Sequence, residues 1–406
     1  MKLPPADWMA RRGLAALIAA LDGKARFVGG AVRDTLLGLE VKDVDIATPL
    51  LPVDVMDRLT AASIKVVPTG IAHGTVTAVL PDGPVEITTL RRDVSTDGRR
   101  ATVAFSDDWE EDAARRDFTI NALSADPRTL EIFDAFGGLE DLKNLRIRFI
   151  GSAEERIAED HLRIMRYFRF LARFGQQQVD DEAFAACAAA AAKLETLSRE
   201  RVADELLKLL NTEDPRFAAS QMIDAGIFDH VVEDIDENSR ALFGRLVERE
   251  QRLQIMPAAI RRLVALLPKD AETANRIARS LKLSKKQQKA IGERLLHELD
   301  RDTPGPNTAP TDIRAFAYRT NVDAARDVAL LFTDEAALPA MLGQLKDWRP
   351  PTFPLTGGYL IEQGLKPGPV VARTLAKIEA VWIAHEFPDE QWIRQYVDEQ
   401  DLTLLA

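Results

Sequence analysis

The stretch RFVGGAVRDTLLGLEVKDVDIAT, residues 26–48, constrains the fold of this chain more than any other feature. A short apolar run ends at Gly29-Gly30, a helix-forming segment follows, and KDVDIAT then alternates between apolar and polar residues as a strand does. Strand residues two apart face the same side of a sheet, so Asp43 and Asp45 are expected to project together. The stretch therefore predicts a strand, a turn, a helix and a second strand that carries a carboxylate pair.

The carboxylate pair predicts a metal site. Two carboxylates held side by side are costly unless a cation neutralises them. Oxygen ligands of this kind suit Mg²⁺, which binds a few carboxylates together with substrate phosphates, so Asp43 and Asp45 are the predicted ligands. A two-metal site also needs a third carboxylate from a neighbouring strand. Glu86 in VEITTL is the candidate for this third group, and Asp117 is the alternative.

The Gly-Gly turn predicts an anion site beside the carboxylates. Gly30 would let backbone N–H groups approach an anion closely, and the helix that opens near Val32 would point its N-terminus at the same place. Arg33 adds a forked donor for phosphate. Taken singly, a Gly-Gly turn can be only a turn, and Asp-x-Asp only a surface pair. Taken together, a triphosphate at the turn and metals at the aspartates describe nucleotidyl transfer.

A second candidate site is the segment ERIAEDHLRIMRYFRFLARFG, residues 155–175. At about 100° per residue, four arginines fall within an arc of about 120°, with apolar residues on the opposite side. These arginines are Arg163, Arg166, Arg169 and Arg173. They would repel one another, and an anion such as a triphosphate would relieve that repulsion; the alternative is a solvated basic stripe. Asp160 and Arg163 together offer an acceptor and a forked donor, the groups that hydrogen-bond the Watson–Crick edge of a base.

The rest of the chain divides into a mixed first third and a helical remainder. HGTVTAVL and PVEITTLRR alternate as strands around a PDG turn, which predicts a hairpin. Residues 91–112 are polar and predict a mobile loop. Beyond about residue 146 the strand signals stop and helical periodicity takes over, interrupted by Pro-rich joints at 302–312 and 347–358.

Composition excludes several classes of protein. No apolar run in the 406 residues approaches the roughly 20 needed to span a bilayer, so no membrane partner is expected. A single cysteine, Cys187, permits no intrachain disulfide and fits a cytoplasmic location. The five histidines have no ligand spacing that predicts zinc. The net charge of −11 argues against general nucleic-acid binding, but phosphate contacts depend on local basic stretches such as 279–294, which contains Lys285 and Lys286.

The N-terminus has two interpretations. Arg11-Arg12 followed by GLAALIAAL faintly resembles a secretion signal. An amphipathic helix ending at Asp22-Gly23 is favoured instead, because cleavage there would fall only a few residues before the glycine turn.

Five motifs, in order, resemble the class II tRNA nucleotidyltransferases, the family of CCA-adding enzymes and bacterial poly(A) polymerases. GGAVRDTLLGLEVKDVDIAT resembles the family's metal and triphosphate motif, and VEITTLRRD resembles its third-carboxylate strand. EEDAARRDFTINALSADP resembles the motif that links head to neck, EDHLRIMRYFRF the base-selecting helix, and SRERVADELLKLL the closing neck motif. These motifs cover about residues 26–210, roughly half of the chain.

The resemblance implies an α+β fold. A polymerase-β-like nucleotidyltransferase head, with a mixed sheet and helices, would be followed by an all-α neck, body and tail. The expected domains are a catalytic head at 1–145, a neck for base selection at 146–212, a body at 213–300 and an RNA-binding tail at 301–406.

The resemblance also assigns roles to residues. Asp43 and Asp45 would bind Mg²⁺, with Glu86 as the third catalytic carboxylate. The nucleotide-binding residues that it implies are Gly30, Arg33, Arg116, Glu159, Asp160, Arg163, Arg166 and Arg169. Among these, Asp160 and Arg163 would pair with the incoming base, with Glu159 in support. Arg116 would position the nucleotide from the neck junction.

Within this family, the sequence predicts addition of CCA to the tRNA 3′ end from CTP and ATP, without a nucleic-acid template. PTGIAHGTVTAVL resembles tRNA enzymes more than poly(A) polymerases, and the intact segment 91–112 favours a full CCA-adding enzyme over a CC-adding one. A poly(A) polymerase, an A-adding or CC-adding specialist, and a non-catalytic RNA-binding protein are the alternatives. Asp43, Asp45 and Arg163 argue against the last, since binding alone needs no metal pair. No protein partner is implied.

Overall fold

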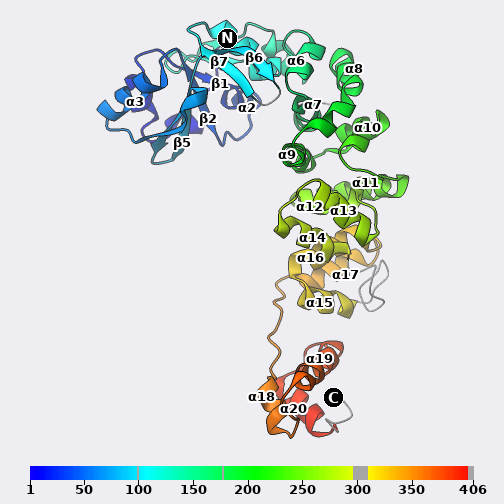
Figure 1. Cartoon of the computed structure of the whole chain (residues 1–406). Helices are drawn as coiled ribbons and strands as arrows, with labels where there is room; N and C mark the ends of the chain where they lie inside the picture. The colour runs from blue at the N-terminus through cyan, green and yellow to red at the C-terminus, as the bar shows by residue number, and fades with distance from the viewer. Residues whose placement is uncertain (98–99, 176–177, 296–309, 401–406) are drawn as a thin grey trace. The chain divides into compact units, whose positions relative to one another are not determined.

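The first part of the chain is built on a mixed sheet. The computed structural model describes residues 1–97, 100–175, 178–295 and 310–400. Among these residues the larger sheet has the strand order β3-β4-β5-β2-β1-β8-β9. At its centre β2 (Val44–Thr48) runs antiparallel to β1 (Arg26–Val28) and parallel to β5 (Gly83–Thr89). These three strands are labelled in Figure 1. The outer strands are β3 (Val66–Gly70), β4 (Thr75–Leu80), β8 (Ser124–Ala125) and β9 (Ile132–Phe133).

The strand, turn, helix and strand predicted from residues 26–48 are confirmed. Between β1 and β2 lies α2 (Gly30–Leu36), and Gly38 follows it at a φ of +68°, a left-handed conformation that suits glycine. The predicted hairpin is also confirmed, because β4 and β5 pair antiparallel with Leu80 opposite Gly83. Side-chain alternation in these segments was therefore enough to predict the centre of the sheet.

The segment predicted as a mobile loop, residues 91–112, has regular structure in its described residues. It contains a hairpin of β6 (Arg91–Asp97) and β7 (Arg100–Phe105), followed by α4 (Trp109–Ala114). The loop prediction was wrong because it gave weight to the polar residues. The β-branched Val and Thr residues within RRDVSTD and RATVAF favour strands.

The predicted N-terminal helix packs into the sheet domain. It is α1 (Leu14–Ala20), in which Leu14 and Leu17 are buried, and Gly23 follows at a φ of +70°. Before it lies the short helix η1 (Asp7–Ala10). Two further helices in this part of the chain are α3 (Pro52–Ala61) and α5 (Gly138–Lys143).

In the described residues after β9 the structure is helical, as predicted. The helices up to residue 233 are α6 (Ala153–Glu159), α7 (Leu162–Phe174), α8 (Asp181–Ala189), α9 (Arg199–Leu210) and α10 (Arg216–Asp224). The predicted apolar face of α7 is buried at Ile164, Met165, Phe168 and Leu171. This burial fixes the rotation of α7 and therefore the direction of its arginine stripe.

Residues 234–406 form a second unit, and residues 1–233 the first. The described helices of the second unit are α11 (Glu237–Arg252), α12 (Ala259–Leu266), α13 (Ala271–Ser280), α14 (Lys285–Leu295), α15 (Pro310–Arg319), α16 (Val322–Phe332), α17 (Leu338–Leu345), α18 (Gly357–Glu362), α19 (Pro369–Ala384) and α20 (Glu390–Asp398). Buried ion pairs join Glu250 of α11 to Arg261 and Arg262 of α12. The predicted division into head, neck, body and tail stays a prediction.

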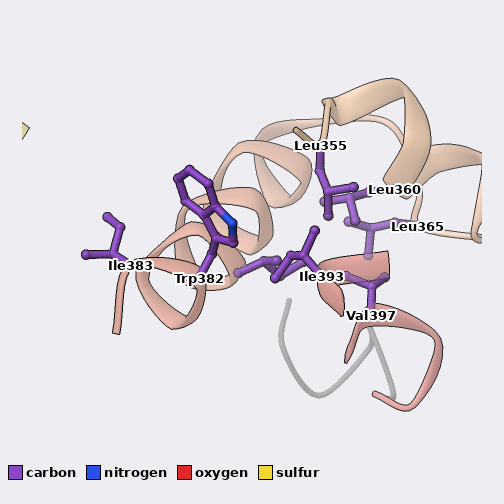
Figure 2. Close-up of a cluster of buried hydrophobic side chains, with 8 residues drawn as sticks. Leu355, Leu360, Leu365, Trp382, Ile383, Ile393 and Val397 are labelled. Atoms are coloured by element: carbon purple, nitrogen blue, oxygen red, sulfur yellow. The ribbon is translucent and has the colours of Figure 1, made fainter. Parts of the chain in front are cut away.

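The last three helices share a small apolar core. Figure 2 shows its labelled side chains, which are Leu355, Leu360, Leu365, Trp382, Ile383, Ile393 and Val397. The Pro-rich joint predicted at 347–358 precedes and enters α18, whereas most of the joint predicted at 302–312 lies outside the described residues. In the part of the chain that the structure describes, no helix has the length and apolarity to cross a bilayer.

Candidate active site

The predicted carboxylates gather at the paired strands β2 and β5. Asp45 and Glu86 are register partners in this parallel pair, and Asp43 lies immediately before β2. Burial and, after it, the charges of Glu86 and Asp43 together raise the pKa of Asp45 to about 6, although the charge of Arg116 lowers it. The structure thus brings Asp43, Asp45, Glu86 and Arg116 within electrostatic reach of one another, as the strand pattern predicted for the three acids.

The donor set at this edge fits a hard divalent cation. Asp43 and Glu86 are exposed and Asp45 is half-buried, so their oxygens can be reached from solvent. The pKa of Asp45 is raised first by burial and then by the neighbouring carboxylates, and a bound cation would offset both effects. Among the described residues, no group of three or more Asp, Glu, His or Cys side chains is arranged to hold a metal ion by itself. Mg²⁺ needs only one or two protein carboxylates when substrate phosphates and water supply its other ligands.

Asp117, the alternative third carboxylate, is engaged elsewhere. It is buried and accepts hydrogen bonds from Arg166 Nε at 2.7 Å, Asn121 Nδ2 at 2.9 Å and the Phe118 amide at 2.9 Å. Burial by itself would raise the pKa of Asp117, but Arg166 and the other donors together lower it below its ordinary value. The structure thus favours Glu86 over Asp117 as the partner of Asp45.

The Gly-Gly turn lies beside these carboxylates. Gly29 has a φ of +62°, and its amide donates to Leu123 O at 3.2 Å. A Cβ at Gly29 would make a tight contact of 3.1 Å with Nη1 of Arg116, and the positive φ of Gly29 also suits glycine. Arg116 also pairs with Asp112 at 3.3 Å. The predicted nucleotide-binding residues Gly30 and Arg116 are therefore close to each other, one at the start of α2 and the other beside the turn.

Arg33 points away from solvent. It is 5% exposed, hydrogen-bonds Asn121 Oδ1 through Nη1 and Asp34 through Nε at 2.7 Å, and lies over the Phe174 ring at 4.6 Å. Burial lowers the pKa of Arg33. Arg33 of α2 therefore packs against α7. Its partners Asn121 and Asp34 were not predicted from the sequence, although both lie within motifs that resemble the family.

The predicted base-reading residues lie at the junction of α6 and α7. Asp160 accepts from the Leu162 amide through Oδ1 at 3.0 Å and pairs with Arg201 of α9 through Oδ2 at 2.7 Å. Arg163 donates to the Glu159 carboxylate and to Arg156 O at 2.7 Å. Asp160 and Arg163 are therefore each oriented by a separate partner and do not neutralise each other. The sequence analysis did not predict a role for Arg201. The only feature that could have indicated one is its position within the motif SRERVADELLKLL.

Carboxylates compensate the other arginines of the stripe. Arg166 pairs with Asp117, Arg169 with Glu205 at 2.9 Å and Arg173 with Asp34 at 2.9 Å. Glu205 is buried on α9, and Arg166 lies 3.9 Å from it. Acids distant in sequence therefore already relieve the repulsion predicted along this face, and its relief by a triphosphate stays a prediction.

Two family models match the chain. Residues 25–148 match the poly A polymerase head domain, and residues 178–238 match the probable RNA and SrmB-binding site of polymerase A. The first match contains the whole β2–β5 carboxylate site. The second covers α8 to α10, including Arg201 and Glu205.

Relatives and solved structures agree with these matches. The mitochondrial CCA tRNA nucleotidyltransferase 1 of Mus musculus is 33% identical over 384 residues, covering 91% of this chain and 85% of the relative. A CCA-adding enzyme of Streptococcus sanguinis is 31% identical over 390 residues, covering 94% and 95%. The crystal structure of a Bacillus stearothermophilus CCA-adding enzyme in complex with CTP aligns with a TM-score of 0.75 at 26% identity, covering 96% of this chain and 98% of that one.

Proposed function

The chain belongs to the class II CCA-adding enzyme family, and we infer that it is a tRNA nucleotidyltransferase that adds the 3′-terminal CCA from CTP and ATP. Curated relatives with this name match it over most of their length, and the structure that it resembles was solved with CTP. The observation that carries the residue assignments is the parallel pairing of Asp45 with Glu86 beside the glycine turn.

We propose that Asp43, Asp45 and Glu86 are the catalytic carboxylates. The family's reaction is metal-dependent, and we assign Mg²⁺, with Asp43 and Asp45 as its ligands. When bound, the ion would stabilise charge on the transferring phosphoryl group and favour attack by the tRNA 3′ hydroxyl. The half-buried Asp45 holds a fixed position on β2, while the exposed Asp43 and Glu86 border the face that substrates reach.

The triphosphate is assigned to the turn between β1 and α2. Gly30 offers a backbone amide at the helix start, and Arg116 brings a guanidinium next to Gly29. Arg33 is assigned to the same region as a positioning residue, because Asn121 and Asp34 already engage its donors. Its burial against Phe174 holds α2 against α7.

Base selection is assigned to Asp160 and Arg163. Asp160 can accept from the exocyclic amine that C and A share, and Arg163 can donate to an adjacent ring nitrogen or carbonyl. U and G would instead turn O4 or O6 toward the carboxylate, leaving unpaired polar groups that cost about 1–3 kcal/mol each. Glu159 orients Arg163, and Arg201 orients Asp160. Arg166 and Arg169 hold α7 in place through their ion pairs with Asp117 and Glu205, respectively.

The proposal includes a cytoplasmic location. It is supported by a single cysteine, Cys187, which is buried. The mouse relative is named as mitochondrial, so fractionation of cells that express the tagged chain is the direct check.

Incubation with tRNA that ends at the discriminator base, followed by sequencing of the product ends, tests the activity. CTP alone should give tRNA ending in CC, ATP alone should give no addition, and both together should give CCA. A homopolymer of A would indicate the poly(A) alternative, and arrest at CC with both nucleotides would indicate a CC-adding specialist. Absence of any addition with Mg²⁺ would favour the RNA-binding alternative.

A further inference from the structure

Arg11 contacts the main chain that leads into the catalytic strand. Its Nη2 donates to Lys42 O at 2.8 Å and lies 3.5 Å from Val41 O. These carbonyls directly precede Asp43, which itself lies one residue before the start of β2. Arg11 therefore contacts the chain before the hydrogen bonds of β2 begin. At this point the position of Asp43 depends on the connecting segment 39–42.

The residues on either side hold Arg11 in place. The Trp8 ring packs edge-on against Phe27 of β1 at 4.7 Å, and its Nε1 donates to Thr35 Oγ1 of α2 at 2.9 Å. On the other side, the main-chain amide of Arg12 donates to Asp82 at 2.8 Å. The segment is thus attached to β1 and α2 before Arg11 and to the β4–β5 turn after it.

We propose that Arg11 is a positioning residue for the Asp43 carboxylate. This inference rests on the proposed function, in which Asp43 binds the metal. A guanidinium that donates to a carbonyl restrains the preceding peptide units, and metal ligands must keep their geometry to within about 0.5 Å. Without Arg11 those carbonyls can bond to water, so the fold persists while Asp43 gains freedom.

The matched control is the neighbouring arginine. The Arg12 side chain is 74% exposed and pairs with Asp82, away from Asp43. Because exposed ion pairs contribute little, Arg12→Ala should leave the activity and the fold unchanged. Arg11→Lys keeps a cationic donor that can reach one carbonyl but lacks the fork, so it should recover part of what Arg11→Ala loses.

The test uses the full chain and three measurements on each variant. They are kcat and KM for CTP addition to tRNA lacking CCA, the Kd for Mn²⁺ without nucleotide by electron paramagnetic resonance, and the thermal unfolding midpoint. For Arg11→Ala we expect a fall in kcat on the order of 10-fold, a KM for tRNA near the wild-type value, and Mn²⁺ binding weakened by about 10-fold. The unfolding midpoint should match that of Arg12→Ala.

Two results would overturn the inference. One is wild-type kcat and Mn²⁺ affinity in Arg11→Ala. The other is a loss that accompanies a lowered unfolding midpoint and is not recovered by Arg11→Lys, which would make the contact purely structural. If wild-type protein and Arg12→Ala added no nucleotide, the proposed function would fail instead, and the Mn²⁺ comparison between Arg11→Ala and Arg12→Ala would still decide the role of Arg11.

Discussion

Asp45 and Glu86 stand opposite each other on two parallel strands, and burial together with this neighbouring carboxylate raises the pKa of Asp45 to about 6. A carboxylate strained in this way lowers the stability of the metal-free fold once it ionises. The same strain gives a cation a site at which its binding is favourable.

Stability should report this strain. The folded-state pKa of Asp45 is raised above its ordinary value of 3.8, so stability is full below that value and is lost as pH rises through about 6. Asp45→Asn removes the ionisation and should stabilise the metal-free protein at pH 7.5 by on the order of 1–3 kcal/mol. Chemical denaturation in EDTA from pH 3.5 to 8 measures this. If the free energies of unfolding of wild-type protein and Asp45→Asn differed by the same amount at every pH, the raised pKa given to Asp45 would be contradicted.

Asp117 should behave in the opposite way. Its pKa is lowered in the folded state, so its ion pair with Arg166 stabilises the fold above the ordinary carboxyl range, and this stability is lost as pH falls through the lowered value. Asp117→Ala leaves the partly exposed Arg166 guanidinium, the Asn121 side-chain amide and the Phe118 main-chain amide without this acceptor, and should cost about 1–3 kcal/mol. Thermal unfolding of Asp117→Ala beside Glu86→Ala provides the comparison. If Glu86→Ala proved the more destabilised variant, the structural role given to Asp117 would be wrong.

Base selection should depend on Asp160 more than on its anchor. Asp160→Ala should lower incorporation of CTP and ATP and narrow their advantage over UTP and GTP by about ten- to a hundredfold. Arg201→Ala, which only releases Asp160 Oδ2, should have a smaller effect in the same direction. Single-nucleotide incorporation with each triphosphate on matched tRNA ends measures both. Full discrimination in Asp160→Ala would return residues 159–163 to a structural helix junction.

The second unit has a hollow with four basic residues in its lining, which we propose as a contact site for tRNA. Arg279, Lys285, Lys289 and Arg319 line it together, whereas Lys286 on the same helix does not line it. Lys285→Glu should therefore weaken tRNA binding and reduce its salt dependence, with Lys286→Glu as the matched control. Filter binding at a series of salt concentrations measures the tRNA affinity of both variants. Equal effects of both substitutions would point to long-range charge and away from this hollow.

The strands around the active site could be predicted because their signals are local. The period-two alternation identifies the strand of Asp45, with Asp43 just before it, and the same alternation identifies the strand of Glu86. The partners that orient the second site could not be predicted in this way. Arg201 meets Asp160 across 41 residues of sequence, and Arg173 meets Asp34 across 139. No local pattern encodes such pairings, which depend on how whole helices pack.

The catalytic carboxylates are the centre of this account, and one measurement tests them most directly. Asp43→Asn, Asp45→Asn and wild-type protein are incubated with tRNA lacking CCA, CTP, ATP and Mg²⁺, while tRNA affinity is measured on the same preparations. The account predicts that wild-type protein completes CCA, and that both variants bind tRNA as wild type does but lose activity by at least about 10³-fold. A variant that binds tRNA and completes CCA at near wild-type rates would contradict it.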